Sequence, residues 1–142
     1  LEKGEPVAIR NPFAVRPWQH VLEPLSGYLL LAEELYLKDK NVFASLNFGP
    51  SDEGARSVQW IVERLGEEWG QVSPWVQHLG EQPHEANYLK LDISKARFKL
   101  GWEPRWSLYE ALQKTSDWHR AWLAGEDVHQ KSLEQIKQYI MR

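Results

Sequence analysis

Arg16, Trp18 and His20 stand at alternate positions of one short segment that also contains Pro17 and Pro24. A guanidinium offers a planar set of donors that matches a phosphate, and it stays charged at every relevant pH. The segment therefore predicts a site for an anionic, planar ligand. The alternative is a surface arginine that stacks on Trp18. His20 by itself is better interpreted as a packed or hydrogen-bonded imidazole than as a catalyst.

A second polar group lies in an expected loop over residues 80–87. Gln82, His84 and Glu85 place an amide, an imidazole and a carboxylate within four residues, where they could contact a ribose or a phosphate. The alternative is an ordinary polar turn. A zinc-binding helix would need a second histidine four positions after His84, and that position is Tyr88. We therefore predict no metal site.

Asn47 ends an expected strand, just before Gly49, and could present its amide to a ligand. A plain turn is the alternative, because asparagine is common in turns. Tyr36 and Lys40 have the spacing of a short-chain dehydrogenase catalytic pair. We interpret this match as a coincidence, because the chain has no upstream glycine-rich turn to bring a nicotinamide near them.

Several motifs are absent from the sequence. It contains no Gly-x-Gly-x-x-Gly, no phosphate-binding loop, no Gly-x-Ser-x-Gly turn and no evident cluster of catalytic carboxylates. We therefore predict neither a bound cofactor nor a catalytic residue in this chain. The eight tryptophans are an unusual number for this length, and we expect the seven that follow Trp18 to pack in the core and at its edges.

Composition narrows the class of protein. The 142 residues are 42% hydrophobic and 26% charged, which is ordinary for one globular domain over residues 1–142. A net charge of −3 argues against a nucleic-acid or membrane-surface binder. The chain has no cysteine, which fits a reducing cytosol, so we expect a cytoplasmic location. Because it begins abruptly at Leu1, we expect a piece of a longer protein.

Periodicity predicts an α/β unit in which helices predominate over short strands. Strands are expected at residues 6–10, 42–48, 72–78 and 88–91. The first helix should open at Pro24 and end near residue 39, and the second should end at Gly70. Further helices should run from Asp92 to Gly101, from a capping box at Ser107 to Gly125, and from a similar box at Ser132.

Each long helix should bury one apolar stripe. The stripe of the first helix is Leu25, Tyr28, Leu29, Ala32, Leu35 and Tyr36. That of the second is Val58, Ile61, Val62, Leu65 and Trp69. The helix after Ser107 has Leu108, Ala111, Leu112, Thr115, Trp118 and Trp122.

Residues 92–104, Asp-Ile-Ser-Lys-Ala-Arg-Phe-Lys-Leu-Gly-Trp-Glu-Pro, resemble the carboxy-terminal signature of extended short-chain dehydrogenase/reductases that act on nucleotide sugars. More narrowly, the chain resembles the CDP-glucose 4,6-dehydratase family. This likeness is carried by residues 9–12, 16–28, 47–52, 83–86 and 88–92. It runs over nearly the whole chain in one order.

The resemblance implies a fold and a role. The chain is expected to be the carboxy-terminal, substrate-binding domain of an extended short-chain dehydrogenase/reductase, without the Rossmann domain that holds NAD(P) and the catalytic groups. The parent enzyme would oxidise CDP-glucose at C4, remove water across C5 and C6, and return the hydride to C6, giving a precursor of the dideoxy sugars of surface polysaccharides such as O-antigen. We expect the parent to form a homo-oligomer, and this chain alone to be inactive.

The resemblance also implies residue roles. Arg16 falls where relatives place an arginine on the diphosphate, and Asn47 where they place an asparagine on the nucleotide. Gln82, His84 and Glu85 fall in a loop that closes on the nucleotide, where relatives have Arg-Pro-Gly. Gln82 and His84 depart from that pattern, which leaves Arg16 a larger share of the anion. The alternatives are another nucleotide-sugar epimerase or dehydratase, and a binding module without catalysis.

Overall fold

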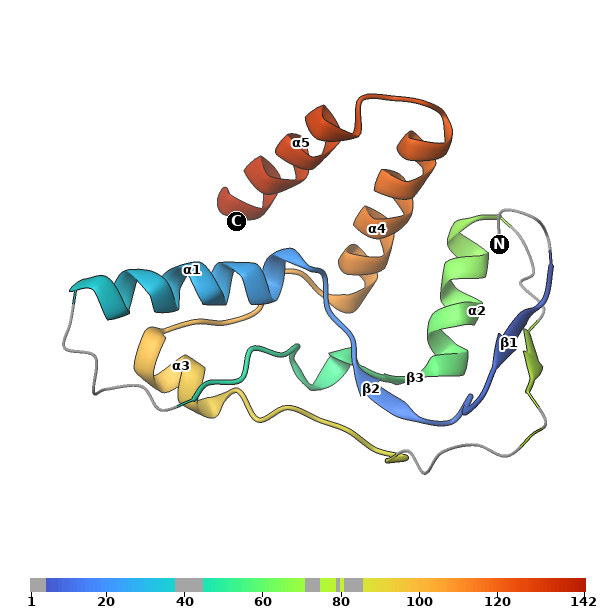
Figure 1. Cartoon of the computed structure of the whole chain (residues 1–142), viewed down its shortest axis with the longest axis horizontal. Helices are drawn as coiled ribbons and strands as arrows, with labels where there is room; N and C mark the ends of the chain where they lie inside the picture. Colours follow the sequence, from blue (N-terminus) through green and yellow to red (C-terminus); the bar gives the residue numbers. More distant parts are fainter. Residues whose placement is uncertain (1–4, 38–44, 71–74, 79, 81–85) are drawn as a thin grey trace.

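The structure of the chain is a computed structural model that describes residues 5–37, 45–70, 75–78, 80 and 86–142. Helices predominate over short strands within these ranges, so the predicted α/β class is confirmed (Figure 1). The elements, in chain order, are β1 (Val7–Ile9), β2 (Val15–Pro17), α1 (Leu22–Leu37), the 3-10 helix η2 (Asp52–Gly54), β3 (Ala55–Ser57), α2 (Val58–Glu68), β4 (Trp75–Gln77), α3 (Ser94–Leu100), α4 (Leu108–Leu123) and α5 (Val128–Ile140).

The helices form pairs around the short strands. α1 packs beside α3 at one end of the molecule, and α2 lies with β1 at the other (Figure 1). α4 contacts α2 on one side and α5 on the other. None of the described helices is both long and apolar enough to cross a membrane.

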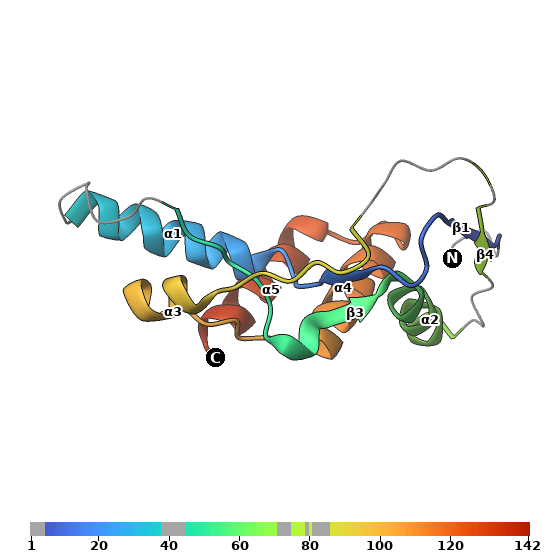
Figure 2. The same cartoon turned by 90° about the horizontal axis from the view of Figure 1, so that it is seen from below.

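β2 is paired along both of its edges. It is antiparallel to β3, with Arg16 directly opposite Arg56. On its other edge Val15 forms a parallel bridge to Tyr88, and its amide donates to the carbonyl of Asn87 at 2.8 Å. Figure 2 shows the segment that contains Asn87 and Tyr88, in yellow, running beside β2. β1 and β4 form a separate parallel pair.

The expected strands are shorter than predicted, or absent. Residues 45–48 are irregular, and residues 42–44 lie outside the described ranges. Residues 88–91 contribute one bridge at Tyr88 rather than a strand. β1 and β4 do fall inside their predicted ranges, although residues 71–74 are not described.

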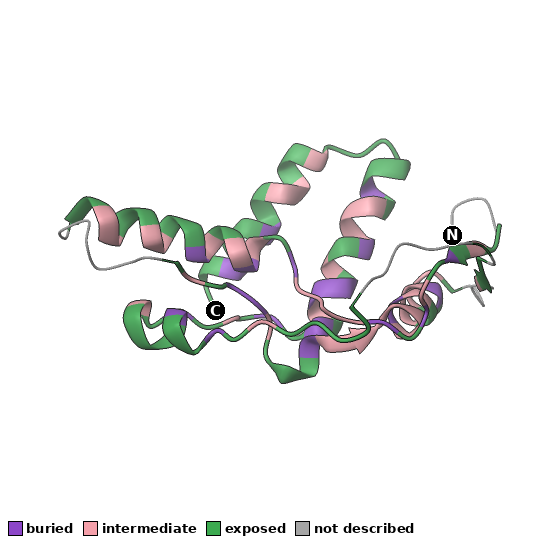
Figure 3. Cartoon of the chain, turned by 60° about the horizontal axis from the view of Figure 1, so that its bottom comes forward, coloured by how far each residue is buried: buried purple, intermediate pink, exposed green. Residues whose placement is uncertain are grey.

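The predicted buried stripe of α1 is wrong. Leu29 is 73% exposed and Tyr36 is 90% exposed, whereas the buried residues of the helix are Glu23 and Gly27 (Figure 3). The cause is Gly27, because a side chain there would overlap the ring of Phe48. α1 is apolar on several sides, so periodicity alone cannot tell which side the core will contact.

Local end signals are mostly confirmed. α2 ends before Gly70 and α3 before Gly101, and both glycines have positive φ. Ser107 and Glu110 form the predicted capping box. Asp92 accepts from the Ser94 amide at 2.8 Å, at the start of α3. In α4 the predicted stripe holds as far as Leu112, but Thr115 and Trp122 are exposed.

The predicted start of α5 at Ser132 is wrong. The helix begins at Val128, because the Asp127 carboxylate accepts from the amides of His129 and Gln130. The Ser132 hydroxyl donates instead to the Val128 carbonyl, one turn earlier in the same helix. The cap at Asp127, five residues upstream, therefore makes Ser132 an interior helix residue.

Two clusters of buried hydrophobic residues stand out in the part of the chain that the structure describes. Phe48, Ile93, Ala96 and Trp102 form one between α1 and α3. Ile61, Leu108 and Leu112 form the other between α2 and α4, with Trp18 and Trp60 against it. Trp102 and Trp106 are buried as predicted, whereas Trp122 is 52% exposed.

A buried carboxylate joins the parts of the molecule between these clusters. Glu23, 1% exposed, accepts from the amides of Arg105 and Trp106 at 3.0 and 2.8 Å. The Tyr139 hydroxyl donates to it at 2.7 Å. Ser26 lies 2.9 Å from the same hydroxyl. The start of α1 is thereby fixed to the chain before α4 and to the end of α5.

Replacing Glu23 should destabilise the fold. In Glu23→Ala, two buried donors and one part-buried donor lose this acceptor, and we expect the free energy of unfolding to fall by about 3 kcal/mol. Urea unfolding followed by tryptophan fluorescence measures it. Glu33→Ala, at an exposed site of the same helix, is the control and should change stability by less than about 0.5 kcal/mol. A loss below about 1 kcal/mol in Glu23→Ala would contradict the role given to this carboxylate.

Candidate functional site

Arg16 lies in β2 and forms a hydrogen bond to Ala86, near the end of the predicted ligand-binding loop. Its Nη1 donates to the carbonyls of Val15 at 2.9 Å and of Ala86 at 2.8 Å. Ala86 is the residue that directly follows Glu85 in the sequence. Gln82, His84 and Glu85 themselves lie outside the described residues.

Arg56 is a site residue that the sequence analysis missed. It is the β3 partner of Arg16, and directly opposed residues of an antiparallel pair project from the same face. Its guanidinium carbon lies 5.6 Å from the centre of the Trp60 ring, and its Nη1 donates to the Ala55 carbonyl at 3.3 Å. Among the described residues no carboxylate pairs with it. The signal was hidden because the register of β2 on β3 is a long-range contact.

The two arginines stand at directly opposed positions of β2 and β3, so this pair of strands carries two positive charges on one face. A guanidinium can donate two parallel hydrogen bonds to a phosphate. The arrangement therefore suits an anionic ligand better than a neutral one.

Asn47 lies at the far end of the segment that Arg16 holds. Its Nδ2 donates to the carbonyl of Asp92 at 3.3 Å, and its side chain is exposed. The seven residues from Ala86 to Asp92 would span about 20 Å from first to last if extended. Arg16 and Asn47 thus contact opposite ends of one segment, an arrangement that suits an elongated ligand.

The next residue after Asn47 anchors this part of the site. The ring of Phe48 is in the core, and its carbonyl accepts from Gln19 Nε2 at 2.9 Å. Lys90, between the two ends of the segment, pairs with Asp52 at 2.8 Å. The hydrogen bond from Lys90 holds the pKa of the Asp52 carboxyl below its ordinary value. Both side chains are exposed, so the pair adds little stability.

His20 is a packed imidazole, as predicted. It is 7% exposed, its Nδ1 accepts from the Leu22 amide at 3.3 Å, and its ring lies edge-on to Trp106 at 4.8 Å. Burial, together with the nearby positive charge of Lys114, lowers its pKa to about 4. His20 is therefore neutral at pH 7.

The sequence analysis also considered the Tyr36–Lys40 pair and a metal site. Tyr36 is on the exposed side of the last turn of α1, and Lys40 lies outside the described residues. Within the ranges that the structure describes, no group of three or more histidine or acidic side chains could hold a metal ion.

Comparison with known proteins supports the resemblance drawn from the sequence. CDP-glucose 4,6-dehydratase of Salmonella typhimurium strain LT2 is 48% identical to this chain over 140 residues. The match covers 99% of this chain but 39% of that protein, so the chain spans well under half the length of this relative. A UDP-glucose 4-epimerase of Rhizobium leguminosarum bv. trifolii is 26% identical over 116 residues. No family model matches the chain.

Solved structures share the fold. The UDP-glucuronic acid 4-epimerase of Bacillus cereus, in complex with UDP-glucuronic acid and NAD, matches with a TM-score of 0.68 and 22% identity. The alignment covers 82% of this chain and 35% of that one. The UDP-glucose-4-epimerase of Stenotrophomonas maltophila, with bound NAD and formylated UDP-arabinopyranose, matches with a TM-score of 0.70 and 23% identity, over 84% of this chain and 36% of that one. The described residues therefore have the fold of one part of these larger enzymes.

The buried, neutral His20 should make stability depend on pH. Its pKa is about 4 in the fold and 6.5 when unfolded, so the unfolded chain binds more protons between these values. The stabilisation is complete above pH 6.5 and is lost as the pH falls, by about 2 kcal/mol between pH 7 and pH 5.

Urea unfolding of the wild type and of His20→Gln at both pH values measures this contribution. The variant should lack it, whereas His129→Gln, at an exposed site, should behave like the wild type. Parallel pH profiles for the wild type and His20→Gln would contradict the prediction.

Proposed function

We propose that this chain is the substrate-binding part of a CDP-glucose 4,6-dehydratase and that it holds the nucleotide diphosphate of the sugar. The observation that carries the proposal is the 48% identity to such an enzyme over 99% of the chain. The opposed arginines of β2 and β3 support it independently, because a nucleotide sugar carries two phosphates in a row.

Arg16 and Arg56 would flank the diphosphate. Part of Arg16 is already committed to the Val15 and Ala86 carbonyls, so one guanidinium would offer too few donors for two phosphates. Arg56 would supply the missing donors and charge. A partly buried diphosphate is costly unless its charge is paired, which explains why two cations face each other here.

The remaining site residues would bind the nucleotide. Asn47 has one amide N–H on the Asp92 carbonyl, and its exposed amide could still contact the ligand. Gln82, His84 and Glu85 would close over the nucleotide from a loop whose base Arg16 holds at Ala86. Arg16 would thus contact both the ligand and the base of the loop that closes over it.

The reaction would need groups that this chain does not contain. The proposed enzyme converts CDP-glucose to CDP-4-keto-6-deoxyglucose, a hydro-lyase reaction with an internal oxidation and reduction. NAD(P), held elsewhere in a complete cytoplasmic enzyme, would supply the hydride chemistry. The sequence here has no glycine-rich dinucleotide turn, so its residues do not fit that cofactor. We propose that the chain alone has no dehydratase activity and that the complete enzyme is a homo-oligomer.

A UDP-sugar epimerase is the second candidate, favoured by the fold shared with the UDP-glucose-4-epimerase. Competition binding in the complete enzyme separates the two. CDP-glucose should bind at least tenfold more tightly than UDP-glucose or dTDP-glucose, a difference of about 1.4 kcal/mol. Equal or tighter binding of UDP-glucose would reject the assignment to CDP-glucose.

Substitution of either arginine should weaken binding of CDP-glucose. A hydrogen bond to a charged group contributes about 1.5–3 kcal/mol, so Arg56→Ala should raise the dissociation constant by about tenfold to a hundredfold. Arg16→Ala should cost at least as much, because it also releases the Ala86 carbonyl. Calorimetric titration of the complete enzyme with CDP-glucose measures both.

Two further variants serve as controls. Arg56→Lys keeps the charge and should recover part of the affinity. Arg64→Ala removes an arginine of α2 that pairs with Glu67 and Glu68, and should leave the dissociation constant unchanged. Unchanged affinity in both Arg16→Ala and Arg56→Ala would reject the site.

A further inference from the structure

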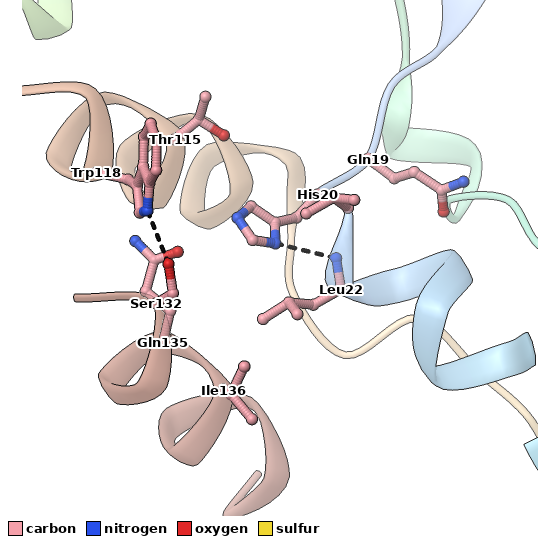
Figure 4. A pocket seen from close by; sticks show the side chains of 9 residues that line it. Gln19, His20, Leu22, Thr115, Trp118, Ser132, Gln135 and Ile136 are labelled. Atoms are coloured by element: carbon pink, nitrogen blue, oxygen red, sulfur yellow. Dashed lines mark hydrogen bonds between the residues drawn. The ribbon is translucent and has the colours of Figure 1, made fainter. Parts of the chain in front are cut away.

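A cavity of about 430 Å³ lies where the start of α1 meets α4 and α5 (Figure 4). Its size is that of a site for a small molecule. Its lining residues are Gln19, His20, Val21, Leu22, Thr115, Trp118, Ser132, Gln135 and Ile136. Neither arginine of the candidate site nor Asn47 lines it, so it is a separate place in the fold.

The walls of this cavity are mainly apolar, and most of their polar groups already have hydrogen-bond partners. Val21, Leu22 and Ile136 contribute hydrocarbon surface. Trp118 Nε1 donates to the Ser132 hydroxyl at 2.9 Å, which leaves the face of the indole as apolar wall. Thr115, Ser132 and Gln135 donate to the backbone carbonyls of Ala111, Val128 and Lys114. Gln19 Nε2 donates to the Phe48 carbonyl, whereas Gln19 Oε1 is buried without a hydrogen-bond partner among the described residues.

His20 provides one directed donor in this apolar space. Its Nδ1 accepts from the Leu22 amide, so the single proton of the neutral ring is on Nε2. Nε2 points toward the space between Trp118 and Ser132 (Figure 4). Among the described residues it has no hydrogen-bond partner. The side chain is 7% exposed and stays neutral at pH 7, because burial lowers its pKa to about 4.

We infer that this cavity is a binding site for a small, neutral, planar aromatic molecule that carries one hydrogen-bond acceptor. The acceptor meets His20 Nε2, and the rings pack against Trp118 and Ile136. A charged ligand is disfavoured, because the walls offer no counter-ion and burying an unpaired charge is costly. The inference does not depend on the function proposed above.

Quinoline and naphthalene test the inference as a matched pair. They have the same two fused rings, but only quinoline has a ring nitrogen that accepts a hydrogen bond. Titration at pH 7 is followed by NMR, through the indole N–H of Trp118 and the ring signals of His20. Quinoline should shift both sets of signals and bind about threefold to tenfold more tightly than naphthalene, the contribution of one hydrogen bond.

Two variants separate the acceptor contact from simple apolar binding. His20→Phe keeps an aromatic ring but removes the donor, so the preference for quinoline should disappear. Ile136→Trp approaches from α5, fills the cavity, and should abolish binding of both compounds. It also gives a test if His20→Phe does not fold. His129→Phe, at an exposed position, should bind like the wild type.

Three results would overturn the inference. The first is no shift of the Trp118 signal at millimolar quinoline. The second is an unchanged preference for quinoline in His20→Phe, or unchanged binding in Ile136→Trp. The third is loss of quinoline binding in the complete enzyme, because another part of that enzyme would then occupy the cavity.

Discussion

The buried carboxylate of Glu23 is the constraint on which the other parts of the structure depend. A carboxylate removed from water is costly unless donors surround it, and here two backbone amides and the Tyr139 hydroxyl do so. Its position in the first turn of α1 adds the favourable end of the helix dipole. Because its donors come from the chain before α4 and from the end of α5, satisfying one charge fixes three segments. Burial raises the pKa of Tyr139 to about 12, which keeps this donor protonated across the physiological range.

That fixed point also orients both sites. Residues 19–22 leave β2 and enter α1 just before Glu23, so the carboxylate sets how His20 faces α4 and α5. The fixed position of Glu23 also restricts the course of the short connection from β2 to α1. The arginine pair and the cavity therefore have no residue in common, but both adjoin the connection between β2 and α1 that Glu23 holds in place. The opposed arginines form a local positive site in a chain whose net charge is −3.

Local signals in the sequence predicted much of this fold, and long-range contacts account for most of what they missed. Ser107, Gly70 and Gly101 act on their own neighbours, so the ends they mark were correct. The face of α1 depends on Phe48, a residue of another segment, and was predicted wrongly. For α5 the sequence contains two residues that could cap the helix, Asp127 and Ser132, and the helix starts at the earlier one, Asp127.

The same distinction applies to the site. The chemistry of Arg16 was visible from its residue type, but its bond to Ala86 and its opposition to Arg56 arise only when β2 pairs on both edges. That double pairing has a consequence for the behaviour of the chain in solution. A strand with an open edge is a template for intermolecular addition, and charged side chains are one common protection against it. β2 already uses both edges within its own chain, so Arg16 is not needed to repel other strands. The backbone of β2 is closed to the addition of a further strand.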